Sequence, residues 1–296
     1  MRPLLFFMIA ISAMTLLCTA FAAEPQGVDL AALQGWDIVV AEDARPSESY
    51  AAKEFQSHLG QATGLELPIV TESDRPNLHI FIGASEPMKA SPVGFDTSTF
   101  GPEDLRIVIR DDNIVIAGGR PRGTLYGVYV FLEDYLGVRF LTADHTHVPK
   151  IASPHVVGPL DRFYHPPLSF RWSYYEENSG NPAFGVRLRN NTITDETKLG
   201  GKTQVELINH SFGYLIPSSK YGKEHPEYFA EIEGKRLSDV SNDWYETEPC
   251  LTNPEVLRIV TEEVLKILAE HPEKANISVS QNDNDKYCRC ARSLSE

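Results

Sequence analysis

The sequence predicts an α/β protein in which an N-terminal α/β sandwich-like domain precedes the first part of a (β/α)8-type barrel. Two observations support this fold class. Between Trp36 and Leu141, short apolar runs typical of strands alternate with longer helical stripes. After Asp161, the order strand, long connection, strand, helix, strand and polar loop is typical of a barrel built from βα units.

In the first half, strands are expected at residues 37–40, 67–70 and 78–82, and a helix is expected from Ser47 until Gly64. Two apolar runs, 105–109 and 114–117, flank a polar turn and predict a β-hairpin.

A second helix begins at Thr124, which can cap it, and ends at Gly137. Its apolar residues recur at helical spacing, and a strand follows at 138–141. Five prolines then fall between residues 149 and 167 without a regular period. We therefore expect a linker at 151–161, between a domain at 23–150 and a second domain at 162–296.

In the second half, strands are expected at 168–175, 205–210 and 275–280, with the polar loop 281–285 after the last. Thr252-Asn253-Pro254-Glu255 predicts the start of a long amphipathic helix. A complete barrel takes about 250 residues, whereas 136 run from Asp161 to Glu296. We therefore expect a truncated barrel.

The first 22 residues have the pattern of a secretory signal peptide. Arg2 precedes an apolar run from Leu4 to Leu17, and Ala20-Phe21-Ala22 matches the small-residue cleavage rule. The apolar run is shorter than the roughly 20 residues of a membrane-spanning helix. The sequence predicts a secreted or periplasmic protein without stable membrane insertion.

The charge balance argues against nucleic acid as a partner. The chain carries 27 basic and 41 acidic residues, so its formal charge is −14, and losing Arg2 with the signal peptide makes it −15. Polyanions are repelled by such a surface. The glycine-rich run 118–123 lacks the residues of a phosphate or dinucleotide site, so no cofactor is expected.

Asp283 is the catalytic residue that the sequence favours. It follows the expected strand 275–280, and the loops at the carboxyl ends of barrel strands form the active-site face. Asn282 beside it is expected to bind substrate. The alternative for this Asn/Asp-rich loop is a turn whose side chains bond its own backbone.

Three further residues are candidates for substrate binding because they end or follow expected strands: Arg171, Trp172 and His210. Arginine offers a bidentate fork to a carboxylate-bearing sugar, tryptophan a flat apolar platform, and histidine a hydrogen bond or a proton. The alternatives are a core aromatic residue and a structural histidine.

The cysteines that follow the signal peptide are Cys250, Cys288 and Cys290. In an oxidising compartment, a disulfide from Cys250 to one of the other two is favoured. A structural zinc site would need a fourth ligand and a longer spacer than Cys288-Arg289-Cys290 provides. We therefore expect no metal.

The segment 120–140, with the sequence RPRGTLYGVYVFLEDYLGVRF, resembles the N-terminal α/β domain that precedes the barrel in family 67 α-glucuronidases and, more loosely, family 20 hexosaminidases. The second half resembles the bacterial domain-of-unknown-function family 4838. The matching stretches are HPEYFA at 225–230 with GKR at 234–236, CLTNPEV at 250–256, and SVSQNDN at 278–284 with YCRC at 287–290. The resemblance implies an architecture and brings no catalytic residues.

The function hypothesis is an exported glycoside hydrolase, or a fragment of one, that acts on polysaccharide or oligosaccharide, including chains with uronic acid. It would use a carboxylate pair for acid/base catalysis, with the second carboxylate expected beyond Glu296. The alternative is a non-catalytic carbohydrate-binding protein of the surface or periplasm, since amides, acids and aromatics also serve binding.

Overall fold

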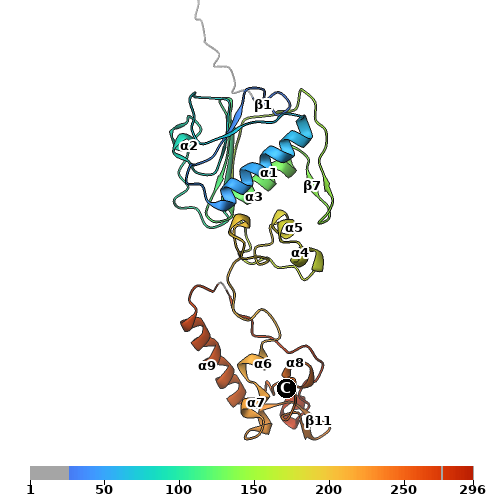
Figure 1. Cartoon of the computed structure of the whole chain (residues 1–296). Coiled ribbons are helices and arrows are strands. Elements are labelled where there is room, and N and C mark those ends of the chain that lie inside the picture. Colours follow the sequence, from blue (N-terminus) through green and yellow to red (C-terminus); the bar gives the residue numbers. More distant parts are fainter. Residues whose placement is uncertain (1–26, 275, 296) are drawn as a thin grey trace, which may run out of the picture.

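The computed structural model describes residues 27–274 and 276–295, which form two lobes joined by a narrow connection (Figure 1). The N-terminal lobe comprises residues 27–204 and is built on a mixed β-sheet. The C-terminal lobe comprises residues 205–274 and 276–295 and consists mainly of short helices around one long helix. The expected signal peptide lies outside the described residues.

The sheet of the N-terminal lobe has six strands in the order β10-β5-β6-β4-β2-β3. The strands β3, β2, β4 and β6 run parallel, whereas β5 and β10 continue the sheet antiparallel. Their bounds are β2 Asp37–Val39, β3 Ile69–Val70, β4 His79–Ile82, β5 Leu105–Arg110, β6 Asn113–Gly118 and β10 Leu160–Tyr164.

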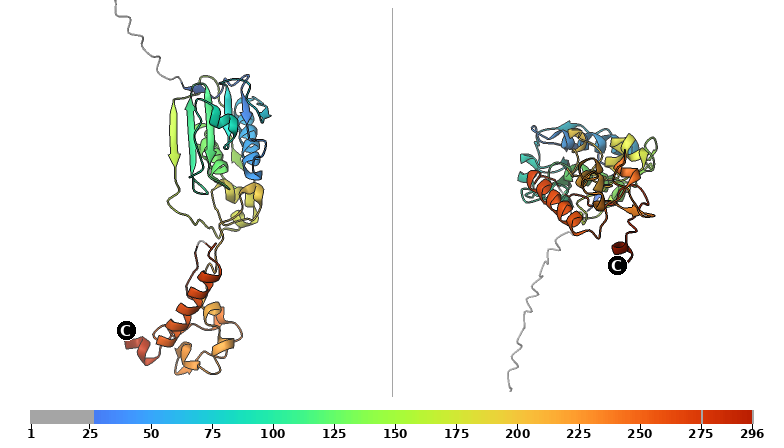
Figure 2. Two further views of the ribbon diagram at one scale, coloured as in Figure 1. Left: turned by 90° about the vertical axis from the view of Figure 1, so that its left-hand side faces the viewer. Right: turned by 90° about the horizontal axis from the view of Figure 1, so that it is seen from below.

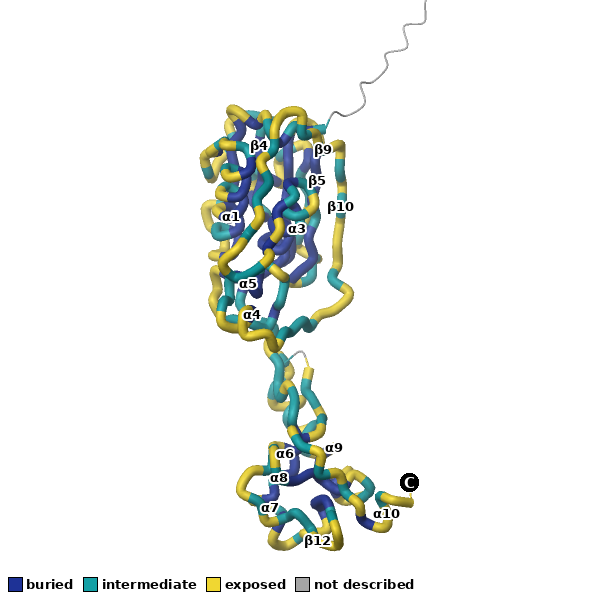
Figure 3. The backbone as a smooth tube through the Cα atoms, turned by 90° about the vertical axis from the view of Figure 1, so that its right-hand side faces the viewer, coloured by how far each residue is buried: buried dark blue, intermediate teal, exposed yellow. Residues whose placement is uncertain are grey.

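Helices cover both faces of this sheet (Figure 2). The helices α1 (Pro46–Thr63) and α3 (Gly123–Tyr135) lie side by side on one face, where Phe55 of α1 packs on Phe131 of α3. On the other face, α2 (Glu86–Ala90) covers a smaller apolar layer that includes Phe81 and Met88. The buried residues therefore concentrate in and around the sheet (Figure 3).

The sequence-based predictions for this lobe are largely confirmed. The helix expected from Ser47 spans Pro46–Thr63 and ends at Gly64, whose φ of 80° is the left-handed conformation that glycine adopts without strain. The expected hairpin forms as β5 and β6, and the second helix forms as α3. The expected cap is wrong: α3 begins at Gly123 after Arg122, and Thr124 Oγ1 instead accepts a hydrogen bond from Gly118 N at 3.1 Å. The α/β fold class is confirmed.

The segment expected to be a linker, 151–161, is instead part of the N-terminal lobe. Strand β9 (Val156–Val157) pairs with β1 (Val28–Asp29), and β10 begins at Leu160 as the edge of the sheet. The prolines misled the prediction because Pro149, Pro154 and Pro159 fall between the strands, where no ladder hydrogen bond is lost.

The N-terminal lobe also extends beyond the expected boundary. A small hairpin of β7 (Arg139–Phe140) and β8 (Thr146–His147) precedes β9, and after β10 come α4 (Glu176–Gly180), α5 (Pro182–Arg187) and the 3₁₀ helix η1 (Thr197–Leu199). Phe184, Val186 and Leu199 from this later segment are buried in the same core as α1 and α3. The chain therefore leaves this lobe only after η1.

The C-terminal lobe has a smaller core of its own. The long helix α9 (Pro254–Glu270) begins with Asn253 as its N-cap and packs Val256 and Val260 against Phe212 and Phe229. The remaining elements are α6 Phe212–Leu215, α7 Ser218–Tyr221, η2 Pro226–Tyr228, β11 Glu231–Ile232, β12 Lys235–Arg236, α8 Asp243–Glu246 and α10 Ala291–Ser295.

The strands expected in the second half do not form as regular strands. Residues 168–175 have no regular structure, and 205–210 and 276–280 pair through one parallel bridge, Glu206 with Ile277. Leu207 and His210 have positive φ values of 43° and 50°, which break an extended conformation. The two segments nevertheless lie parallel, joined through α9. Over the described residues, no closed barrel forms.

No helix within the described part of the chain has both the length and the apolar character needed to cross a membrane.

We expect Gly119→Ala to destabilise the N-terminal lobe. A Cβ atom on Gly119 would lie 1.7 Å from the carbonyl oxygen of Gly101, so the backbone must shift. The expected loss is at least about 1–3 kcal/mol of unfolding free energy. Urea denaturation measures it, with Gly158→Ala as the control, because a Cβ there meets nothing within 4 Å. Equal stability of the two variants would contradict this packing.

Candidate functional site

The parallel segments 205–210 and 276–280 end at the same edge of the C-terminal lobe. The main-chain N–H groups of Ser211 and Phe212 both donate to the Ser280 carbonyl oxygen at 3.2 Å, and Ser280 N donates to Ser211 Oγ at 2.8 Å. His210 Nδ1 lies 3.1 Å from the Gln281 carbonyl oxygen. These bonds place His210 and the loop after Ser280 next to each other, as expected for neighbouring βα units.

A pocket of about 180 Å³ opens beside this edge. Phe212 and Tyr287 provide aromatic surface, Gln281 an amide and Glu248 a carboxyl group. The Tyr287 hydroxyl donates to Gln281 Oε1 at 3.3 Å. The lining residues are Phe212, Glu248, Pro249, Leu251, Thr252, Gln281, Tyr287, Cys288 and Ser293.

Glu248 is the most unusual polar residue of this pocket. The residue is 3% exposed, and its Oε1 is buried without a hydrogen-bond partner among the residues that the structure describes. An unpartnered buried acceptor is costly, and native proteins rarely keep one unless it has a task. The residue follows α8 and lies next to Pro249, whose main chain bridges to Phe229. This bridge holds the main chain next to Glu248 in place and thereby positions its carboxyl group.

Burial raises the pKa of Glu248 to about 7, because a charged carboxylate loses solvation inside the lobe. The main-chain N–H of Asn282 and the nearby His210 act in the opposite direction, since both favour the carboxylate. A perturbed carboxyl in a pocket is typical of functional sites, although structural networks also produce such shifts.

The two residues expected in the polar loop have different positions. Asn282 is buried, accepts a bond from Gly213 N at 2.8 Å, and donates to the carbonyl oxygens of Asp243 and Thr247 at 3.1 and 3.0 Å. Its amide therefore holds backbone segments together. Asp283, next to it, is exposed at the end of the segment. The same loop thus holds a positioning residue and a solvent-facing carboxyl group.

Arg171 and Trp172 lie in the other lobe. Arg171 forms an ion pair with Glu103, and its Nε donates to the Arg189 carbonyl oxygen at 2.8 Å. Trp172 is half-buried and packs on Tyr174, with their ring centroids 4.3 Å apart. The structure therefore does not bring the predicted site residues together, because the segment 168–175 belongs to the N-terminal lobe.

A larger pocket of about 400 Å³ lies on the N-terminal lobe, between α3, β10 and residues 166–168. Its three arginines are each paired with an acidic residue. The pairs are Arg162 with Asp134, Arg171 with Glu103, and Arg189 with Glu133. Because the charges of these pairs neutralise one another, this pocket is less suited than the Glu248 pocket to bind a charged ligand.

The three cysteines converge beside the Glu248 pocket, and all three are free thiols in the structure. Cys250 Sγ lies 3.8 Å from Cys290 Sγ. Hydrogen bonding from Ser293 is the main cause that lowers the pKa of Cys290 to about 6, whereas burial raises the pKa of Cys288. The disulfide expected from the sequence stays a prediction.

Sequence reasoning did not find Glu248. It stands in the run Glu246-Thr247-Glu248-Pro249-Cys250, where nothing in the periodicity separates it from its exposed neighbour Glu246. Its position two residues before the CLTNPEV stretch was the only available signal. Burial of one particular carboxyl group depends on how α8 and the loop at 281 fold over it.

The fold and site define a protein with an α/β sandwich lobe and a second lobe that carries a buried carboxyl group beside a three-cysteine cluster. The model of the family described as domain of unknown function (DUF4838) matches residues 140–295, more than half of the chain. The chain belongs to this family. Among curated proteins, none matches it in sequence.

Several solved structures of glycoside hydrolases share part of the arrangement. The family GH20 β-N-acetylhexosaminidase from Streptomyces coelicolor A3(2) is 16% identical, with a TM-score of 0.37 over 72% of this chain and 38% of that one. A family GH115 4-O-methyl-α-glucuronidase with specificity for decorated arabinogalactans is 11% identical, with a TM-score of 0.47 over 82% and 42%. The chain thus spans about two fifths of these enzymes. Such scores assign no activity.

Proposed function

We propose that the chain is part of an exported glycoside hydrolase that acts on polysaccharide or oligosaccharide, including chains with uronic acid. Glu248 supplies one of the two carboxyl groups that this chemistry uses. The observation that carries the proposal is its buried Oε1, which has no partner among the described residues, in a pocket at the carboxyl ends of two parallel segments. A sugar hydroxyl would donate to this atom, and the protonated carboxyl group would donate to a glycosidic oxygen.

The other walls of the pocket suit a sugar. Phe212 and the half-exposed Tyr287 offer ring surface for the apolar face of a pyranose, and Gln281 offers amide hydrogen bonds to hydroxyl groups. Among the described residues, Asp283 is the candidate for the second carboxyl group. It follows Asn282, whose main-chain N–H reaches the Glu248 carboxyl.

Glu248→Gln is expected to lower sugar release about 10²–10⁴-fold, the usual contribution of a positioned acid or base. The measurement is reducing-sugar release from a panel of neutral and uronic-acid polysaccharides by the complete protein that contains this chain. Asp283→Asn tests the second carboxyl group. Glu270→Gln, at the exposed end of α9, is the matched control and is expected to keep full activity.

Two outcomes would overturn this proposal. Unchanged sugar release by Glu248→Gln would remove the residue from the chemistry. If the wild-type protein releases no sugar but binds a polysaccharide, and Glu248→Gln weakens that binding, the carbohydrate-binding function replaces the hydrolase. The same Tyr287 and Phe212 surfaces would then serve recognition alone.

The proposed localisation is outside the cytoplasm, after cleavage that leaves Ala23 as the first residue. It rests on the charge, apolar run and cleavage pattern of the first 22 residues. Polysaccharides too large to enter a cell are met there, which agrees with a hydrolase of this kind. The strongly acidic chain also argues against nucleic acid as a partner.

A further inference from the structure

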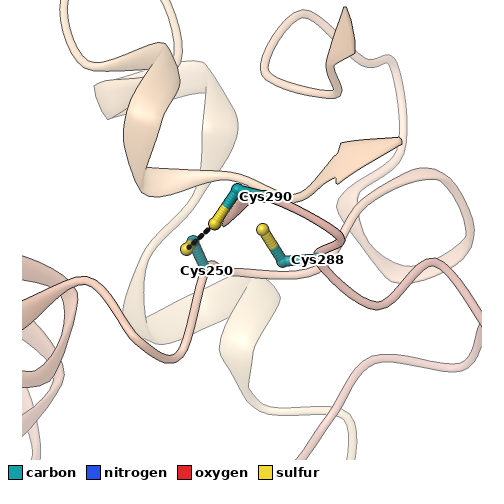
Figure 4. A group of neighbouring side chains, drawn as sticks. All are labelled: Cys250, Cys288 and Cys290. Atoms are coloured by element: carbon teal, nitrogen blue, oxygen red, sulfur yellow. Dashed lines mark hydrogen bonds between the residues drawn. The ribbon is translucent and has the colours of Figure 1, made fainter. Parts of the chain in front are cut away.

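Three sulfur atoms meet in the C-terminal lobe, contributed by two separate segments (Figure 4). Cys250 lies just before α9, and Cys288 and Cys290 lie in the loop that leads to α10. Their Sγ atoms all lie within 4.8 Å of one another. From the sequence we expected a disulfide between Cys250 and one of the other two cysteines and no metal, whereas the fold brings all three sulfurs together.

The spacing of one sulfur pair matches tetrahedral metal coordination, and Cys288 Sγ lies within 4.8 Å of both sulfurs of that pair. A zinc ion holds thiolates at about 2.3 Å, which sets neighbouring sulfurs about 3.8 Å apart. Cys250 Sγ and Cys290 Sγ are 3.8 Å apart. Thiolates are soft ligands, and tetrahedral sulfur-rich sites favour Zn²⁺ among common divalent ions.

Two hydrogen-bond donors face the sulfur of Cys288. Glu231 N donates to Cys288 Sγ at 3.3 Å, and Arg236 Nη1 lies 3.7 Å from the same sulfur. Three thiolates and one Zn²⁺ carry a net charge of −1, and Arg236, which also pairs with Glu231 at 3.1 Å, lies beside them. Outer donors of this kind orient and tune metal ligands.

The open fourth corner of such a tetrahedron would lie beside two hydroxyl groups. Ser293 Oγ lies 3.3 Å from Cys290 Sγ and 3.9 Å from Cys250 Sγ, and Thr252 Oγ1 lies 3.0 Å from Ser293 Oγ. Ser293 and Cys288 also line the Glu248 pocket. A water molecule at this corner could bond both hydroxyls and face the pocket, as in zinc sites with an open position.

We propose that Cys250, Cys288 and Cys290 bind one Zn²⁺, with a water held by Ser293 in the fourth position. The ion ties the start of α9 to the β11–β12 hairpin and to the loop before α10. The apolar core of the C-terminal lobe is small, and metal binding adds folding free energy to lobes of this kind. The site is independent of whether the chain hydrolyses glycosides.

The test is the zinc content of the complete protein, produced in zinc-supplemented medium and purified without chelator. We expect one zinc per chain by elemental analysis and loss of that zinc in Cys290→Ser. Cobalt substitution should give the near-ultraviolet absorption of thiolate-to-metal charge transfer. Alkylation of the denatured, unreduced protein should modify Cys250, Cys288 and Cys290 alike.

A variant that adds a ligand keeps the proposal testable if Cys290→Ser fails to fold. Ser293→Cys places a fourth thiolate at the open corner and should slow zinc loss to a chelator. Ser295→Cys adds an exposed thiol two residues further on and should leave the rate unchanged. Wild-type protein without zinc, with Cys250 and Cys290 protected from alkylation, would establish a disulfide and overturn the proposal. Equal zinc retention in both variants would also overturn it.

Discussion

Glu103→Gln is expected to lower the free energy of unfolding of the N-terminal lobe by about 3–5 kcal/mol. Glu103 Oε1 accepts from Arg122 Nε at 2.9 Å and from Asn191 Nδ2 at 2.7 Å, and Oε2 pairs with Arg171. The side chains of Glu103 and Arg122 are only 8% and 7% exposed. An amide would leave the guanidinium of Arg122 buried without a counter-charge.

The loss should exceed the effect of removing an exposed ion pair. Asp161→Asn is the matched control, because Asp161 binds Arg106 through two hydrogen bonds of 2.7 and 2.8 Å, with both side chains substantially exposed. Exposed pairs contribute about 0.2–1 kcal/mol. Urea denaturation measures both variants. If both lose the same small amount, main-chain carbonyls and water replace Glu103 as partners of the arginines.

Phe131→Ala and Phe229→Ala are expected to destabilise different lobes, each by about 3–5 kcal/mol. Phe131 is fully buried on α3, and Phe229 is 1% exposed between η2 and β11. The two cores share no residue, so a cavity in one leaves the apolar contacts of the other intact.

Hydrogen exchange measured by mass spectrometry distinguishes the two effects. Phe131→Ala should speed exchange in α1, α3 and the sheet, while Phe229→Ala should speed it in α6 and α9. Leu257→Ala on the exposed side of α9 is the control, because Leu257 is 67% exposed and such changes stay within about 0.5 kcal/mol. Faster exchange throughout the chain in either core variant would show that the lobes unfold as one unit.

Local signals in the sequence were sufficient for the elements of the first half. Gly64 and Gly137 adopt the left-handed conformation at, or just beyond, the ends of α1 and α3. The polar turn after Arg110 joins the two strands of the hairpin. The same holds for α9, whose start is fixed by Asn253 and Pro254. These features depend on neighbours within a few residues, so the sequence contains the information directly.

The sequence-based predictions were wrong where the structure depends on contacts with distant parts of the chain. The prolines near residue 154 indicated a linker, yet β9 and β10 find partner strands that begin at residues 28 and 105. The guanidinium group of Arg171 was expected to bind a sugar carboxylate, but an ion pair with Glu103 neutralises its charge. In both cases the deciding contact lies more than 50 residues away.

By itself, the sequence determined the α/β class, the positions of the main helices, the acidic charge and the family-specific stretches. Only the tertiary structure decided where the first lobe ends, that Glu248 is buried with an Oε1 that has no partner among the described residues, and that Cys250 meets both Cys288 and Cys290. The physical reason is that caps and periodicity follow from local backbone preference, whereas burial and convergence follow from the packing of distant segments.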